Sequence, residues 1–134
     1  MLDKGAIAPT RAHSIDAGLD IYTPIRVKIF PGERAAIDTG VHIDIPAGYV
    51  GFLKSKSGLN VKHGIRTEGG VIDAGYTGSI VASICNGGDE PHTFEAGDKI
   101  TQLVILPIET PEVEIIDCMP NTERGDDGFG STGI

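Results

Sequence analysis

The 134-residue sequence has no tryptophan, three tyrosines, four phenylalanines and two cysteines. With so few aromatic side chains, a hydrophobic core must be built mainly from Ile, Val, Leu and Ala. Cys85 and Cys118 are too few for a disulfide framework and lack CxxC spacing, so we expect two reduced thiols. The four histidines include no i, i+4 pair and no cysteine cluster accompanies them, which argues against a zinc site.

Basic residues and long apolar runs are also scarce. Eleven Lys and Arg against nineteen Asp and Glu give a formal net charge of −8, so stable nucleic-acid binding is not expected. An anionic ligand would need a few placed cations or a divalent metal. No run approaches the roughly 18 apolar residues that span a membrane, and the N-terminal segment lacks the apolar centre of a signal peptide. We therefore expect a soluble cytoplasmic protein with no membrane partner.

What the sequence does contain is period-two alternation of apolar and polar residues, typical of β-strands. It is present over residues 25–29, 41–45 and 80–85, while residues 100–108 are apolar on both faces and suit a central strand. Turn signals rich in Gly, Pro, Asn and Asp separate these runs. Only residues 57–63 favour a helix, of at most two turns, with Ser57 as a possible N-cap. The pattern predicts an all-β antiparallel sandwich or jelly roll. The fold that we expect is a single-domain jelly roll or distorted β-barrel with one short helix.

No linker divides the chain, and its composition changes only after Cys118. We predict one β domain over residues 1–118 and a mobile, glycine-rich C-terminal tail over residues 119–134. A β domain of this size with such apolar strands suits a symmetric homo-oligomer.

Several short stretches carry groups that could do chemistry. The tail RGDDGFGSTGI combines exposed backbone amides, two hydroxyls, a guanidinium and a ring, which suit a phosphate chain and a planar base. It could equally be a solvated tail. Its Gly-x4-Gly spacing is not a P-loop, because Ser131 stands where the lysine should be and no helix can follow. The tripeptide Arg124-Gly125-Asp126 is not expected to be an integrin ligand in a chain without a secretion signal.

Four further positions have both a structural and a functional interpretation. Lys56, Ser57 and Gly58 at a helix start could hold a phosphate or form an ordinary capped turn. Asp73 closes an apolar run between glycines and could be a turn former or a general base. Gln102 interrupts an apolar strand, so its amide needs backbone or ligand partners. The remaining position is Asp20, near the start of the first strand, which could be structural or could face the water shell of a metal, plausibly Mg²⁺.

In their order and spacing, five stretches resemble the five-motif series of the trimeric dUTPase family. The resemblance covers the chain from about Ala17 to the C-terminus, and the third and fifth motifs are the most specific. The stretches are AGLDIYTP, KSGL, GGVIDAGYTGSI, GDKITQLVI and RGDDGFGSTG. The resemblance implies a β jelly roll, a homotrimer with sites between subunits, and Mg²⁺-dependent hydrolysis of dUTP to dUMP and pyrophosphate. Such a reaction limits uracil in DNA and supplies dUMP for dTMP synthesis.

The resemblance also implies roles for individual residues. Asp73 would be the general base that activates water, Tyr76 would pack beneath the deoxyribose, and Asp20 would lie near the Mg²⁺ hydration shell. Uracil would be read by main-chain groups of the hairpin from Gly70 to Val81. The substrate-binding residues implied in this way are Lys56, Ser57, Gly58, Gly70, Val71, Ile72, Tyr76, Val81, Gln102, Arg124, Phe129, Gly130, Ser131 and Thr132. Among these, Arg124 would meet the γ-phosphate and Phe129 would stack over the base.

Three positions depart from the family pattern. Lys56 replaces the usual Arg of the second motif and loses bidentate geometry. Thr77 stands where the third motif often has Arg, and Asp127 where the fifth usually has Gly. We expect these changes to tune affinity or tail closure and to leave the reaction class unaltered. The alternatives are a dCTP deaminase-like enzyme of the same fold, and a nucleotide-dependent regulatory module that binds a protein partner.

Overall fold

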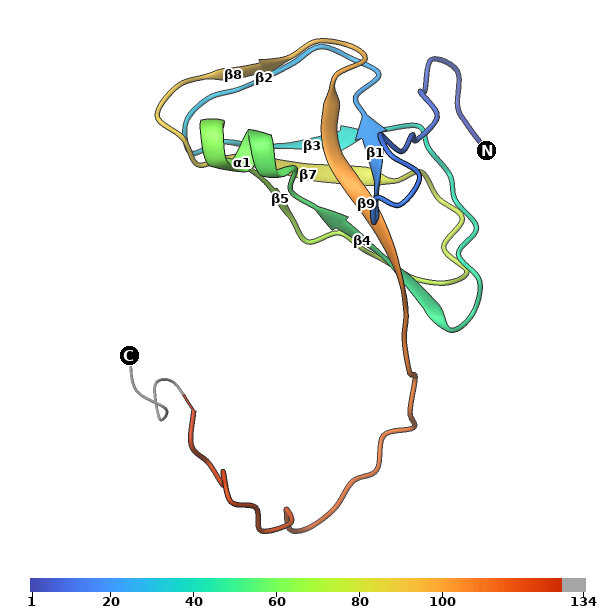
Figure 1. The fold of residues 1–134 in the computed structure, drawn as a ribbon, viewed down its shortest axis with the longest axis vertical. Coiled ribbons are helices and arrows are strands. Elements are labelled where there is room, and N and C mark those ends of the chain that lie inside the picture. Colours follow the sequence, from blue (N-terminus) through green and yellow to red (C-terminus); the bar gives the residue numbers. More distant parts are fainter. Residues whose placement is uncertain (129–134) are drawn as a thin grey trace.

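A computed structural model of the chain describes residues 1–128 (Figure 1). Its elements are nine strands and one short helix. In chain order they are β1 (Gly18–Tyr22), β2 (Val27–Ile29), β3 (Arg34–Asp38), β4 (Tyr49–Lys54), α1 (Ser57–His63), β5 (Ile65–Glu68), β6 (Val71–Ile72), β7 (Val81–Asn86), β8 (His92–Phe94) and β9 (Lys99–Pro107).

The strands form three sheets. One has four strands in the order β1-β9-β4-β6, one has three in the order β3-β7-β5, and β2 pairs with β8. Every pairing between these strands is antiparallel. The all-β jelly roll with one short helix is therefore confirmed, although the three sheets of the described part do not join into a closed barrel.

Strand β9 is the central strand that the apolar run predicted. It pairs with β1 along one side and with β4 along the other, so that Gln102 lies opposite both Asp20 and Lys54. Ile100, Thr101 and Leu103 on this strand are all buried. Burial of a strand with neighbours on both sides explains why it reads as an almost continuous apolar run.

The core between the sheets is aliphatic, as the shortage of aromatic residues predicted. Phe94 is the one aromatic side chain in it within residues 1–128. Its other buried members are Ile21, Ile29, Ile37, Val41, Ile45, Leu53, Ile65, Ile72, Ile80, Ala82, Ile84, Ile100 and Leu103. Strands β7 and β9 each contribute two of these residues and come from different sheets, so the core joins the sheets.

Two local predictions differ from the structure. Residues 41–45 are not a regular strand, although Val41 and Ile45 are buried as their alternation predicted. Their backbone is held by single contacts, such as the bond from the His42 N–H to the Met1 carbonyl (2.9 Å). The helix begins at Ser57, as predicted, but its N-cap is Lys56, with no side-chain capping bond. The prediction of Ser57 as N-cap was wrong because the helical conformation already begins at that residue.

Beyond β9 the chain leaves the body as an extended segment (Figure 1). Residues 109–128 are exposed throughout, including Cys118, whereas Cys85 on β7 is buried. The domain boundary at residue 118 stays a prediction. No helix among residues 1–128 has the length and apolar character to cross a membrane.

Candidate active site

The segment from Gly70 to Val81 borders a pocket of about 240 Å³. The two strands of this segment do not form the predicted hairpin, because β6 pairs with β4 and β7 pairs with β3 and β5. The pocket is lined by Asp73 and Tyr76, together with residues of β4, β6 and β7 and of the turns beside them. The complete lining is Leu53, Gly70, Val71, Ile72, Asp73, Tyr76, Ile80 and Val81. Six of these eight residues are substrate or catalytic residues that the sequence predicted, and the fold brings them together around one opening.

Gly70 allows the segment before β6 to approach β4 closely. Its φ of +89° lies in the left-handed region, and an added Cβ would come within 2.6 Å of the Cβ of Leu53. The Leu53 N–H donates to the Gly70 carbonyl (2.8 Å). Strand β6 then pairs with β4 and forms an edge of its sheet, so its outer backbone groups have no partner strand within residues 1–128. Unpaired N–H and C=O groups are thus available beside the pocket.

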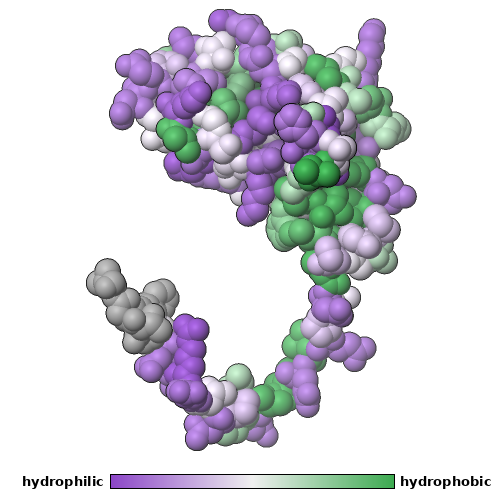
Figure 2. All heavy atoms as spheres, in the orientation of Figure 1, coloured by the Kyte–Doolittle hydropathy of each residue, from purple (hydrophilic) through white to green (hydrophobic). Residues whose placement is uncertain are grey.

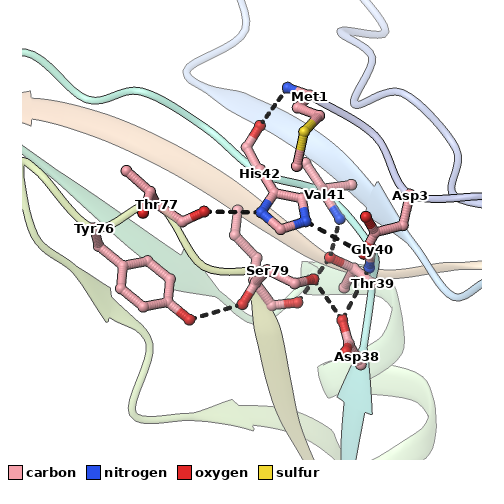
Figure 3. Close-up of polar contacts among 11 residues, drawn as sticks. Met1, Asp3, Asp38, Thr39, Gly40, Val41, His42, Tyr76, Thr77 and Ser79 are labelled. Atoms are coloured by element: carbon pink, nitrogen blue, oxygen red, sulfur yellow. Dashed lines mark hydrogen bonds and ion pairs between the residues drawn. The ribbon is translucent and has the colours of Figure 1, made fainter.

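Asp73 and Tyr76 lie in the turn that follows β6. Asp73 is exposed directly after the buried Ile72, and its carbonyl accepts a bond from the Tyr76 N–H (3.2 Å). The Tyr76 hydroxyl donates to the Ser79 carbonyl (2.9 Å), which holds the ring in place although it is 46% exposed (Figure 3). A free carboxylate and a fixed ring face therefore border the same pocket.

A second group of polar residues lies at the opposite edge of the four-stranded sheet. Asp20 on the edge strand β1 is buried, and its carboxylate contacts the ammonium groups of Lys56 and, at 2.7 Å, Lys99. We call these three residues the charged cluster. Burial alone would raise the pKa of Asp20, but the hydrogen bonds from Lys56 and Lys99 outweigh it and hold that pKa below its usual value.

Gln102 lies beside the charged cluster on β9. Its Nε2 donates to the Ser55 carbonyl (3.0 Å), so backbone satisfies at least one of its amide groups. Its Oε1 lies over Gly18, where an added Cβ would come within 2.2 Å of that oxygen. The glycine of the AGLD motif is therefore needed for space against Gln102, a pairing that links the first and fourth motifs.

Ser57 and Gly58 occupy the first turn of α1, directly after Lys56. The first backbone N–H groups of any helix have no partner within the helix, so these amides can donate to another acceptor. Both residues are exposed. The second motif is therefore brought to the charged cluster and Gln102, and it lies apart from the Asp73 pocket.

Arg124 contacts neither the Asp73 pocket nor the charged cluster of the same chain. It lies in the extended C-terminal segment, where its Nε donates to the Asp127 carbonyl (3.0 Å) within a turn of that segment (Figure 1). The predicted residues Phe129, Gly130, Ser131 and Thr132 lie outside the described residues.

Sequence reasoning missed Leu53 and Ile80 in the pocket and Lys99 in the charged cluster. Leu53 and Ile80 looked like ordinary core positions. Lys99 reaches Asp20 through a register irregularity between Ile21 and Tyr22, where β1 shifts against β9. Alternation along a strand carries no signal for such a bulge.

The donors present bear on the expected Mg²⁺. Within residues 1–128, no three His, Cys, Asp or Glu side chains come together as a metal-binding group. Asp20 is a single carboxylate that already contacts two ammonium groups. This donor set fits a Mg²⁺ ion that a ligand's phosphates hold, with Asp20 at most a partner through water, because Mg²⁺ usually retains waters and binds few protein carboxylates.

Comparison with known proteins identifies the same family over almost the whole chain. The dUTPase family model matches residues 4–133. The deoxyuridine 5'-triphosphate nucleotidohydrolase of Clostridium kluyveri is 42% identical over 98% of this chain and 94% of that protein. The corresponding protein of Cutibacterium acnes is 41% identical over 94% of this chain and 85% of that protein. A variant dUTPase of Staphylococcus bacteriophage 80alpha, solved with dUpNHpp, has a TM-score of 0.92 and 36% identity, covering 99% of this chain and 95% of that one.

Proposed function

This chain belongs to the dUTPase family, and from that premise we propose that it hydrolyses dUTP to dUMP and pyrophosphate. The observation that carries the proposal is the pocket that Asp73, Tyr76 and the Gly70–Ile72 backbone line together. An apolar pocket with a few converging polar groups is the usual form of a small-molecule site.

Asp73 is the general base in this proposal. Its exposed carboxylate at the end of β6 takes a proton from water, and the water oxygen attacks the α-phosphorus. The bond from that phosphorus to the bridging oxygen breaks, so that pyrophosphate leaves with the electron pair and dUMP remains. The proton on Asp73 then returns to solvent.

Base and sugar selection follow from the other groups of the pocket. Uracil presents one N–H donor between two carbonyl acceptors, and the unpaired edge of β6 offers backbone acceptors and donors to match them. Cytosine would leave such groups unpaired, which discriminates strongly against it. The fixed ring of Tyr76 would pack beneath the deoxyribose and leave no room for a 2′-hydroxyl.

The triphosphate would be held by the residues at the other edge of the sheet. Lys56 supplies a cation, Ser57 and Gly58 supply first-turn amides, and Gln102 lies beside them. Mg²⁺ on the phosphates would neutralise part of their charge and polarise the phosphorus, with Asp20 contacting its hydration shell. Arg124 would form an ion pair with the γ-phosphate, and the residues from Phe129 onward would close over the base and phosphates.

We infer that these parts meet in a homotrimer. Asp73 follows the edge strand β6, and Asp20 lies on the other edge strand, β1, with two strands between them. At the usual strand spacing of about 4.8 Å, the strand axes are roughly 14 Å apart, so a pocket on one chain pairs more easily with the charged cluster of a neighbour. Apolar side chains gather where the C-terminal segment leaves the body, and among them Tyr49, Leu106 and Ile108 are exposed, which suits a subunit interface (Figure 2).

One assay tests the activity. The protein is incubated with Mg²⁺ and, separately, dUTP, dCTP, dTTP or UTP, while pyrophosphate and ammonia are measured. Pyrophosphate from dUTP alone is the expected result. Ammonia from dCTP would instead support the deaminase alternative and overturn the proposal.

A truncation tests the C-terminal segment. A chain that ends before Arg124 should keep its fold, since residues 109–128 are exposed, yet lose most of its turnover. Circular dichroism checks the fold, and light scattering on both chains checks for a trimer. Full activity in the truncated protein would contradict the role given to the segment.

A further inference from the structure

His42 connects the N-terminal segment to the turn that carries Asp73 and Tyr76. Its Nδ1 lies 2.8 Å from the carbonyl of Thr77, the residue after Tyr76, and its Nε2 lies 3.2 Å from the carboxylate of Asp3 (Figure 3). The ring is largely shielded from solvent, with the side chain 17% exposed. One imidazole therefore touches two segments that are far apart in the sequence.

The two partners of His42 determine its protonation. The Thr77 carbonyl can only accept a hydrogen bond from Nδ1, while the buried Nε2 faces the Asp3 carboxylate as an ion pair without hydrogen-bond geometry. A neutral imidazole has a single N–H for these two partners. Both contacts are favourable together only when both ring nitrogens carry a proton. The bond to the Thr77 carbonyl and then the Asp3 carboxylate raise the pKa of His42, against the opposing effect of burial and of the Met1 amino group.

The charged groups around His42 agree with this assignment. Asp3 lies at Nε2, the Met1 amino group donates to the His42 carbonyl (3.0 Å), and Asp38 interacts with the ring at longer range. Asp3 and Asp38 are negative, and the hydrogen bonds from Ser79 and Gly40 lower the pKa of Asp38. The Met1 amino group is the only opposing charge that acts on the ring within residues 1–128.

Few other hydrogen bonds join the turn from Asp73 to Ser79 to the rest of the described chain. The Ser79 hydroxyl meets Asp38 Oδ1 at 2.5 Å, and Asp38 also accepts from the Gly40 N–H (3.0 Å). Between Asp73 and Ser79, the bond to Thr77 is the contact that fastens the middle of the turn to another segment of the described chain. A change at His42 therefore acts on the backbone next to Tyr76.

We propose that His42 is a positioning residue: its imidazolium fixes the turn bearing Asp73 and Tyr76 by joining Thr77 to Asp3. The inference rests on the proposed function for its catalytic consequence. Displacing a catalytic group by about 1 Å can cost up to about a hundredfold in rate, so an unfastened turn should have a measurable effect.

Three variants separate the two contacts of His42. His42→Ala removes both of them. His42→Asn keeps an amide donor near the place of Nδ1, so it should retain the Thr77 contact and lose the Asp3 contact. Asp3→Asn leaves the ring in place and should lower the pKa of His42, which NMR titration of the ring measures directly.

The first readout is independent of activity. It is the hydrogen-exchange protection factor of the Tyr76 amide, which is bonded to the Asp73 carbonyl in the free protein. We expect protection to fall about tenfold as pH rises through the pKa of His42, to be low at every pH in His42→Ala, and to be intermediate and independent of pH in His42→Asn. In Asp3→Asn, the midpoint should move to lower pH.

The second readout is kcat/KM for dUTP, compared between wild type and each variant across pH. Because the pKa of His42 is raised, its effect is fully present below its unfolded pKa near 6.5 and is lost as pH rises through the folded value. The wild-type advantage over His42→Ala should therefore be about tenfold at low pH and should shrink at high pH towards the level of His42→Asn, because a neutral imidazole still has one N–H for the Thr77 carbonyl. His42→Asn should recover part of the lost activity, to the same extent at every pH.

These outcomes decide the proposal separately from the function. Unchanged Tyr76 protection in His42→Ala, or an activity ratio that does not vary with pH, would overturn the role of His42 even if dUTP is hydrolysed. His42→Asn behaving like His42→Ala would do the same. If wild type hydrolyses no dUTP, the proposed function fails, and the Tyr76 protection factors still decide whether His42 fastens the turn. If His42→Ala does not fold, the shifted midpoint in Asp3→Asn supports the proposal and an unshifted one overturns it.

Discussion

The two edges of the four-stranded sheet present different kinds of surface. At the β6 edge, the pocket is lined by aliphatic side chains, backbone, the ring of Tyr76 and a single carboxylate, Asp73. At the β1 edge, Asp20 is buried between the ammonium groups of two lysines. The β6 edge offers a shaped pocket beside unpaired backbone groups, and the β1 edge offers one carboxylate paired with two ammonium groups. In the proposed function, recognition of a neutral base and binding of a polyanion would thus use separate parts of one chain.

The comparison also shows how an acidic protein can bind an anion. With a net charge of −8, its surface repels a triphosphate at long range. The charged cluster keeps two cations in one place by pairing them with a buried carboxylate. A base pocket needs no such arrangement, since uracil carries no charge. The first three predictions below each alter one edge and leave the other intact, and the last alters the C-terminal segment.

The largest effect is expected at the pocket edge from Asp73→Asn. The amide cannot take a proton from water, so kcat should fall by about 10² to 10⁴, the usual contribution of a general base. KM should change little, because the charged cluster is untouched. Steady-state kinetics with dUTP measure both. Asp89→Asn, an exposed carboxylate in the loop between β7 and β8, is the matched control. Retention of more than a tenth of wild-type kcat in Asp73→Asn would exclude it as the base.

A smaller effect, on KM more than on kcat, is expected at the charged edge from Lys56→Ala. Loss of one charge-assisted hydrogen bond, worth about 1.5 kcal/mol, should raise KM about tenfold with a lesser change in kcat. Lys56→Arg should lower KM below that of wild type, since a guanidinium binds phosphate in two places. Lys28→Ala on β2 serves as the control for charge alone. A fall in kcat without a change in KM would remove the distinction between the two edges.

Asp20→Asn should affect stability in a way that depends on pH. Because the two lysines lower the pKa of Asp20, its stabilising effect is present above the unfolded value near 3.9 and is lost as pH falls through the lower folded value. We expect the variant to lose about 1 kcal/mol of unfolding free energy near pH 7. Denaturant titrations should show this difference level down to about pH 5 and shrinking below about pH 4. An undiminished difference at pH 3, or an equal loss in the exposed control Asp44→Asn, would contradict the assignment.

The smallest effect is expected from Asp127→Gly. The Asp127 main chain bonds to Arg124 in both directions, through its N–H (3.0 Å) and its carbonyl (3.0 Å), and neither bond needs the carboxylate. Removing one exposed charge near a polyanion should lower KM by no more than about twofold, and less at high salt. A clear loss of activity would mean that this carboxylate has a role of its own.

The elements that the sequence predicted are those with local causes. Residues 57–63 formed the expected helix, and the apolar run before Ile108 formed the central strand, because propensity and alternation act over a few neighbours. The six predicted pocket residues met because they belong to one short stretch of chain, residues 70–81, whose order already places them near one another.

The rest depended on contacts between distant segments. The bond between His42 and Thr77 joins residues 35 positions apart, and the bulge after Ile21 brings Lys99 to Asp20. Residues 41–45 have strand-like alternation, yet their backbone partners include the N-terminal segment and Ile80, so no regular ladder forms. Pairing of this kind is decided by packing in three dimensions and leaves no periodic trace in the sequence.

The difference between the two cysteines has a practical consequence. Cys85 is buried in β7, while Cys118 is exposed on the C-terminal segment, between the body and Arg124. A thiol-reactive fluorophore should therefore attach at Cys118 alone, without any substitution. The native protein thus carries a single labelling point on its C-terminal segment, from which the movement of that segment can be timed as nucleotide is added.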